Sequence, residues 1–267
     1  MSIHQRICDE LAAIEAQENL TILLAIESGS RAWGFASPDS DYDVRFIYVR
    51  RRDDYLRLDE RRDVCEWCLN ETLDINGWDF DKTLRLLRTS NPTLFEWMNS
   101  PIVYHKHPAF DSLMADAGTF FRAEPTLYHY LHMAERSYRE QLQRETVKLK
   151  KYFYVLRPIL ACRHILRHAS PPPMLFGDLV KEHLPAELLA DVQALLRLKE
   201  STSEMGVGPK QQRVHDFIEQ SLHELRAEVD NLPTIPKGDW DQLNDVFLRA
   251  LSVTGRIGDK QLKRWYT

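Results

Sequence analysis

An apolar run, a Gly-Ser pair and an alternating strand follow one another near the start of this 267-residue chain. The run LTILLAI, Leu20 to Ile26, has the length and composition of a buried strand. Gly29 and Ser30 follow it as a turn that exposes backbone N–H groups, with no large side chain to block a phosphate. Residues Tyr42 to Val49 alternate between two faces, which predicts a second strand.

Two acids one residue apart, Asp41 and Asp43, stand at the start of that second strand. Side chains at i and i+2 of a strand project from the same face, so the two carboxylates are expected to lie side by side. Bare carboxylates this close repel each other, unless they are solvated, share a proton or hold a hard cation. Mg²⁺ takes oxygen ligands, often one or two carboxylates plus phosphate oxygens. A solvated strand edge and a magnesium site therefore both remain open on the residues alone.

The order and spacing of these elements resemble a known signature. The string GSRAWGFASPDSDYDV, together with DINGWDFDKTLRLLRTSNPTLFEWMNSPIVY from Asp74 to Tyr104, resembles the DNA polymerase β-like nucleotidyltransferase superfamily. The branch it looks like is a group of predicted nucleotidyltransferases associated with RNA repair. The resemblance covers roughly residues 20 to 170. It implies a palm-like domain followed by helices, dependence on Mg²⁺ (or Mn²⁺), and transfer of a nucleotidyl group from an NTP such as ATP.

The resemblance also implies roles for particular residues. The Gly-Ser pair would contact the triphosphate and the paired acids would hold the metal ions, here Gly29, Ser30, Asp41 and Asp43. A third carboxylate is expected on a neighbouring strand. Asp74, flanked by Leu73 and Ile75, fits that position best, and Asp79 in the same run is the alternative.

Two basic residues are further candidates for nucleotide binding. Arg31 follows the turn and could reach a phosphate through its guanidinium fork, or be a surface residue of a short helix over Arg31 to Phe35. Lys82 matches a basic position of the family and could neutralise phosphate charge, or be an exposed helix residue.

A basic stretch lies further along the chain. Between Arg136 and Arg167 nine Lys or Arg residues stand against two Glu, with tyrosines interleaved. Lys148, Lys151 and Tyr152 fall at i, i+3 and i+4, so on a helix they would share one face and could contact an acceptor nucleic acid or NTP phosphates. A solvated helix face is the alternative.

Composition limits the remaining possibilities. The formal charge of −5 argues against broad coating of nucleic acid, although it allows a local site. Four scattered cysteines do not make a disulfide framework, and Cys65 and Cys68, three apart on a strand, would point to opposite faces rather than chelate zinc. The ten histidines show no HExxH motif or comparable ligand spacing. No run is long enough to span a membrane and no signal pattern opens the chain, so we expect a cytoplasmic protein.

The predicted fold is α+β, with a polymerase β-like nucleotidyltransferase domain over residues 1–110 and a mostly helical region over residues 111–267. Strands are expected over Val64 to Leu69, Thr72 to Phe80 and Ile102 to Tyr104. Asn91 is expected to cap a helix over residues 91–98. The C-terminal half should hold one long helical pattern from Leu127 to His168, broken around Pro158, two later helices near Glu187 to Lys199 and Gln211 to Asn231, and a mobile loop STSEMGVGPK between them.

The function expected from the sequence is a metal-dependent nucleotidyltransferase that moves a nucleoside monophosphate from an NTP to an acceptor hydroxyl, releasing pyrophosphate. An RNA or DNA 3′ end would fit the repair association, and a protein side chain or small molecule would fit the wider superfamily. The alternatives are a non-catalytic nucleotide-binding or interaction module and an antitoxin-like enzyme that transfers AMP to a partner protein. The sequence does not indicate the base, the sugar, the number of additions, a protein partner or the oligomeric state.

Overall fold

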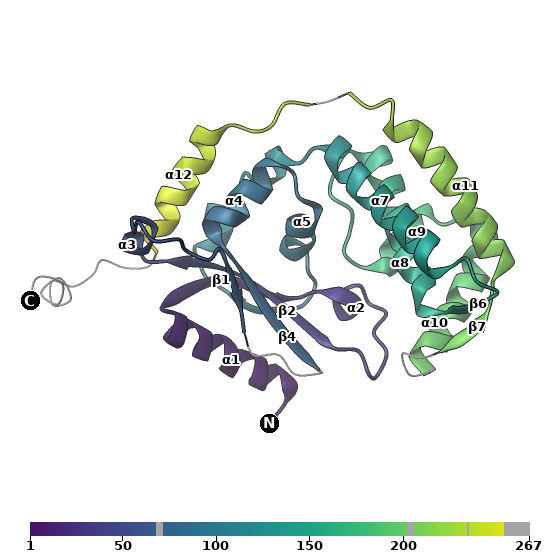
Figure 1. Ribbon diagram of the computed structural model, residues 1–267, viewed down its shortest axis with the longest axis horizontal. Helices are drawn as coiled ribbons and strands as arrows, with labels where there is room; N and C mark the ends of the chain where they lie inside the picture. The colour runs from purple at the N-terminus through teal and green to yellow at the C-terminus, as the bar shows by residue number, and fades with distance from the viewer. Residues whose placement is uncertain (68–71, 202–205, 234, 254–267) are drawn as a thin grey trace, which may run out of the picture.

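The computed structural model describes residues 1–67, 72–201, 206–233 and 235–253. Figure 1 shows a central sheet with helices on both faces, and a bundle of helices beside it. This is the predicted α+β architecture. The sheet has five strands in the order β3-β4-β2-β1-β5. The strands are β1 (Leu20–Glu27), β2 (Tyr42–Arg50), β3 (Val64–Glu66), β4 (Leu73–Asp79) and β5 (Val103–Lys106).

Alternation along β2 decides which helices cover each face of the sheet. Val44, Phe46 and Tyr48 pack in a core with α1 (Ile3–Glu18). Ile47 and Val49 face the other way, into a core with α4 (Phe80–Arg88) and α5 (Pro92–Met98). The two predicted faces of this strand are thereby confirmed. Asn91 accepts a hydrogen bond from the Leu94 backbone N–H (3.2 Å) and caps α5 as predicted.

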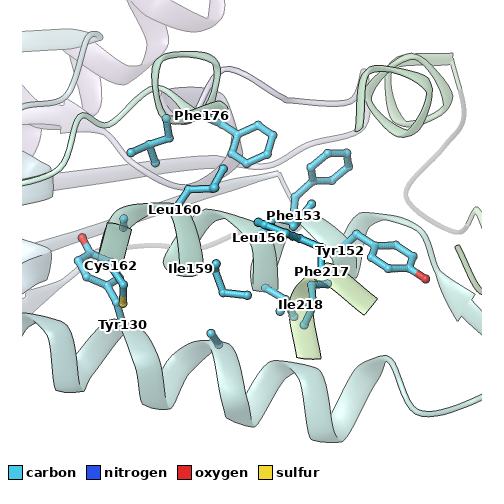
Figure 2. Packing of buried hydrophobic residues seen from close by; sticks show 14 of the residues in the cluster. Tyr130, Tyr152, Phe153, Leu156, Ile159, Leu160, Cys162, Phe176, Phe217 and Ile218 are labelled. Atoms are coloured by element: carbon cyan, nitrogen blue, oxygen red, sulfur yellow. The ribbon is translucent and has the colours of Figure 1, made fainter. Parts of the chain in front are cut away.

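The helical part has a core of its own. Its main helices are α7 (Ala123–Gln141), α8 (Lys150–His168), α9 (Phe176–His183), α10 (Leu189–Ser201) and α11 (Gln212–Val229). Figure 2 shows α8 contributing Phe153, Leu156 and Ile159 to this core, with Tyr130 of α7 and Ile218 of α11 around them. Because α8 is apolar on several sides, it forms the centre of the bundle.

The prediction of one helical pattern broken around Pro158 is wrong. The interruption lies at residues 142–149, and Pro158 is inside α8. Residues Thr146–Lys148 form β6, which pairs antiparallel with β7, Val207–Pro209. The partner strand lies some sixty residues further on, so helical periodicity does not reveal it. β7 also occupies part of the expected loop STSEMGVGPK, of which residues 202–205 lie outside the described part of the chain.

Smaller differences concern the ends of elements. Helix α2 is Gly29–Ala32 and begins two residues earlier than predicted. Strand β3 is Val64–Glu66, and residues 68 and 69 of that predicted strand lie outside the described part of the chain. The charged connection after β2 contains a short helix, α3 (Arg52–Tyr55). Short helical turns α6 (Phe110–Leu113), η1 (Ala117–Phe120) and η2 (Ala186–Leu188) complete the described elements. Cys65 is a buried free thiol, whereas Cys68 lies outside the described residues.

The last described helix returns to the sheet. Helix α12 (Trp240–Leu251) follows α11 in the chain but lies at the left of Figure 1, on the opposite side of the molecule from α11. Leu243, Val246 and Ala250 of α12 belong to the core between the sheet and α4. Part of the C-terminal region thus completes the core of the N-terminal region. The predicted domain boundary at residue 110 remains a prediction. None of the described helices combines the length and hydropathy that a membrane-spanning segment needs.

Candidate active site

The parallel pairing of β2 and β4 sets two of the predicted acids opposite each other. Asp43 and Asp74 are direct partners in the register. A single guanidinium bridges them, because Arg45 Nη2 lies 3.2 Å from Asp43 Oδ1 and 2.8 Å from Asp74 Oδ2. Both carboxylates are therefore within reach of one cation. Sequence reasoning did not select Arg45, although its position two residues after Asp43 places it on the same face of the strand.

Electrostatics around Asp43 favour a bound cation. Burial raises the pKa of Asp43, the carboxylates of Asp74 and Asp41 raise it further, and Arg45 and Arg31 lower it. Desolvation and the neighbouring carboxylates thus oppose ionisation of Asp43. A cation bound beside Asp43 would offset both effects.

The glycine turn closes directly onto Asp43. Gly29 has φ of 61°, in the left-handed region that favours glycine. A Cβ at this position would lie 2.1 Å from Asp43 Oδ2, so only a hydrogen fits between the turn and the carboxylate. The Ser28 N–H also donates to the Asp43 carbonyl at 2.8 Å. Gly29 is thereby brought directly against Asp43, and Ser30 is the next residue of α2.

Glu27, a residue that the sequence analysis missed, holds the backbone of Asp43 in place. Its side chain is fully buried at the end of β1. Glu27 Oε1 accepts the Asp43 backbone N–H at 2.8 Å, and Oε2 accepts the hydroxyl of Tyr104. Burial raises the pKa of Glu27, against the hydrogen bonds from Tyr104 and Asp43, which lower it. The only signal in the sequence is an acid that ends an apolar run, and its partner Tyr104 is 77 positions away.

Asp41 is exposed and lies one residue before β2. Arg31 fixes the backbone there, with Nε donating to the Asp41 carbonyl (3.0 Å) and Nη2 to the Ser40 carbonyl (2.5 Å). The Arg31 guanidinium also lies 3.7 Å from the centroid of the Tyr42 ring. The structure thus gives Arg31 a role in holding the loop that carries Asp41, and contact with phosphate stays a prediction.

Asp79 and Lys82 lie at the opposite end of β4 from Asp74. Five residues of strand separate the two acids, roughly 16 Å. Asp79 is buried, accepts from the Tyr55 hydroxyl at 2.8 Å and caps α4. Lys82 Nζ lies 3.1 Å from both carboxylate oxygens of Asp63. Of the two candidates for the third acid, the structure brings Asp74 next to Asp43 and places Asp79 among structural contacts. It does not bring Lys82 to the acids.

The expected basic helix face does not form. Lys148 is on β6, whereas Lys151 and Tyr152 are in α8. The Tyr152 side chain is fully buried and its hydroxyl accepts the Gln211 backbone N–H at 2.8 Å. The prediction that these three residues share one helix face is therefore wrong, because the chain is not helical between α7 and α8.

A buried ion pair connects the sheet region to the helical bundle beside the turn. Arg157 Nη1 of α8 donates to Glu96 Oε1 of α5 at 2.7 Å, and the Tyr130 hydroxyl donates to the same oxygen at 2.6 Å. The Arg157 guanidinium lies 4.6 Å from the Trp33 ring centroid. The residues that follow the glycine turn are thus packed against the helical bundle.

The fold and the site define an α+β protein with carboxylates on adjacent parallel strands, one of which lies against a glycine turn. The chain belongs to the RNA repair pathway DNA polymerase beta family, whose model matches residues 3–249. Membership of this family supports a nucleotidyltransferase kind of function.

Two individual proteins are similar to the chain. An uncharacterized protein of Bacillus subtilis (strain 168), YcgL, is 42% identical over 256 residues, covering 95% of this chain and 98% of its own. A crystal structure of a nucleotidyltransferase-like protein from Exiguobacterium sibiricum 255-15 aligns with 96% of this chain and 81% of its own. That structure shares 10% identity at a TM-score of 0.31, which is too low to support an inference.

A divalent cation of the kind this family implies fits the residues present. The carboxylates of Asp43 and Asp74 already meet at one cationic group, the Arg45 guanidinium, and the missing Cβ of Gly29 leaves room for Asp43 Oδ2 beside the turn. Oxygen donors of this type are the ligands that Mg²⁺ and Mn²⁺ take.

Proposed function

We propose that this protein is a divalent-metal-dependent nucleotidyltransferase. It transfers a nucleoside monophosphate from an NTP to an acceptor hydroxyl. The new bond joins the acceptor oxygen to the α-phosphorus, the bond from that phosphorus to the bridging oxygen breaks, and pyrophosphate leaves. The observation that carries this proposal is the register of Asp43 against Asp74, with both carboxylates on the Arg45 guanidinium and Asp43 directly against Gly29.

Asp41, Asp43 and Asp74 are the residues that would hold Mg²⁺ or Mn²⁺. When bound, such an ion offsets the charge of the triphosphate and lowers the pKa of an attacking hydroxyl. The triphosphate would pack against the turn at Gly29 and Ser30; the close approach of this turn to Asp43 supports that assignment. One of the three carboxylates takes the proton of the acceptor hydroxyl.

An RNA or DNA 3′ end is the acceptor that membership of an RNA repair pathway family favours. The grouping of Lys148, Lys151 and Tyr152 no longer supports this choice, since the three do not share a helix face. A protein side chain, as in an AMP-transferring antitoxin-like enzyme, is the second possible acceptor class. A nucleotide-binding module without turnover is the alternative of a different class.

Incubation of the protein with each labelled NTP and Mg²⁺, against RNA and DNA 3′ ends and the protein itself, tests the proposal. Asp43→Asn and Asp74→Asn should abolish label transfer, whereas Asp245→Asn, an exposed acid on α12, should leave it unchanged. Metal-dependent NTP binding that both site variants lose, with no transfer, would support the binding-module alternative. Absence of both transfer and binding in the unaltered protein would refute the proposal.

A further inference from the structure

Three histidines and a glutamate converge between two helices of the bundle, outside the acidic site. They are His164 and His168 of α8, and Glu182 and His183 of α9. One ligand atom from each lies within 4.8 Å of all the others. His164 and His168 are four apart, a spacing that puts both rings on one face of a helix. The expectation that the histidines show no ligand spacing is therefore wrong, since the pair His164-x₃-His168 is in the sequence.

The separations within the cluster match a single coordination sphere. His164 Nδ1 lies 3.1 Å from His183 Nε2 and 3.9 Å from Glu182 Oε2, and His183 Nε2 lies 3.5 Å from that oxygen. Bonds of about 2.0–2.1 Å in a tetrahedron place ligand atoms about 3.3 Å apart. These distances scatter around that value. His168 Nε2 lies 2.5 Å from Glu182 Oε1 and within 4.8 Å of the other ligand atoms, so it offers the fourth ligand.

The surroundings suit neutral imidazoles that bind metal. The side chains of His164 and His183 are only 12% and 4% exposed. Ser170 Oγ lies 3.4 Å from His164 Nε2, the nitrogen that faces away from the cluster, and so can orient that ring. Two cations approach the cluster: Arg167 Nη1 is 3.9 Å from Glu182 Oε1, and Arg163 Nη1 donates to the His183 carbonyl at 3.4 Å. Arg167 is 65% exposed, so water screens its charge.

We propose that His164, His168, Glu182 and His183 form a Zn²⁺ site. Imidazole nitrogens with one carboxylate are a donor set that Zn²⁺ takes, and four protein ligands make a structural rather than a catalytic site. An open cleft lined by His164, Pro171, Pro172 and Asp178 gives an ion access from solvent.

The bound ion clamps α8 to α9 across the connection that contains residues 169–175. Both ends of this region contact its neighbours: the N–H of Phe176, the first residue of α9, donates to the Trp33 carbonyl at 2.9 Å, and Arg157 Nη2 of α8 lies 3.4 Å from the carbonyl of Met174 in the connection. The zinc site would therefore stiffen the part of the bundle that packs beside Gly29.

Zinc binding to the full chain tests this inference directly. Chelator-treated protein is dialysed against buffered Zn²⁺, and bound metal is measured by inductively coupled plasma mass spectrometry. One ion per chain is expected, with affinity at least about tenfold weaker in His164→Gln and in Glu182→Gln. His223→Gln, an exposed histidine on α11, is the matched control and should bind as the unaltered protein does. No bound zinc, or equal loss in His223→Gln, would overturn the proposal.

A second measurement guards against variants that fail to fold. Co²⁺ replaces zinc in the unaltered protein, and a tetrahedral site gives intense visible absorption bands. Those bands are expected, and addition of Zn²⁺ should remove them. Weak octahedral absorption, or bands that persist in the Glu182→Gln variant with unchanged affinity, would show that the four residues do not share an ion.

Discussion

Gly29→Ala should disable the acidic site by displacing one carboxylate. The added Cβ would lie 2.1 Å from Asp43 Oδ2 and 3.0 Å from Asp43 Cγ. Ordinary van der Waals contact begins at about 3.4 Å, so the carboxylate has to move by about 1 Å or more. It cannot move without disturbing its ion pair with Arg45, at 3.2 Å. A misplacement of about 1 Å in a reacting constellation costs on the order of 100-fold in rate, and we expect a loss of that size in nucleotidyl transfer.

The chain offers a matched control for the backbone effect of this substitution. Gly34 also has a positive φ, 81°, and its added Cβ would lie 3.1 Å from the flexible end of the Leu175 side chain. Both alanine variants should lose about 1–2 kcal/mol of folding free energy because of the left-handed backbone. Only Gly29→Ala meets the carboxylate.

Urea unfolding, metal-dependent NTP binding and label transfer on both variants separate the two effects. Gly34→Ala should show the stability loss with a much smaller effect on binding and transfer, whereas Gly29→Ala should lose stability, binding and transfer together. If the two variants bind and transfer nucleotide equally well, the contact between Gly29 and Asp43 does not matter for the site, and the reasoning is refuted.

Three further perturbations have defined outcomes. Arg45→Met removes the guanidinium between the two carboxylates, so Mg²⁺ should raise the melting temperature more than it does in the unaltered protein; an equal rise would contradict this role. Arg157→Met leaves the largely buried Glu96 with the Tyr130 hydroxyl but without its cationic partner, and should cost about 3 kcal/mol in urea unfolding, with part regained in the double variant with Glu96→Gln. Burial lowers the pKa of His215, so the unfolded chain binds more protons as the pH falls through about 6.5; stability should decline there, and His215→Leu should remove that part of the decline.

Those parts of the fold that depend on local periodicity were predictable from the sequence. The two faces of β2 follow from a two-residue period, and the cap of α5 from Asn91 and the proline after it. The pairing of Asp43 with Asp74 was a weaker prediction, because it depends on a parallel register that the residues of neither strand encode alone. The contacts of Glu27 with Tyr104 and of β6 with β7 were out of reach, since each joins segments more than fifty residues apart.

The helical bundle helps to position the acidic site, so the palm-like domain does not form this site by itself. Residues 33–35, directly after the glycine turn, are held from outside the sheet: the Trp33 carbonyl accepts from Phe176, and the Phe35 carbonyl accepts from the buried Lys199 Nζ at 2.7 Å. Arg157 packs on the Trp33 ring at 4.6 Å. These contacts come from α8, α9 and α10, each more than a hundred residues further along the chain. Because the turn is only four residues of helix, its own hydrogen bonds are too few to fix it. The position of Gly29 against Asp43 therefore depends on the bundle as well as on the strand that precedes it.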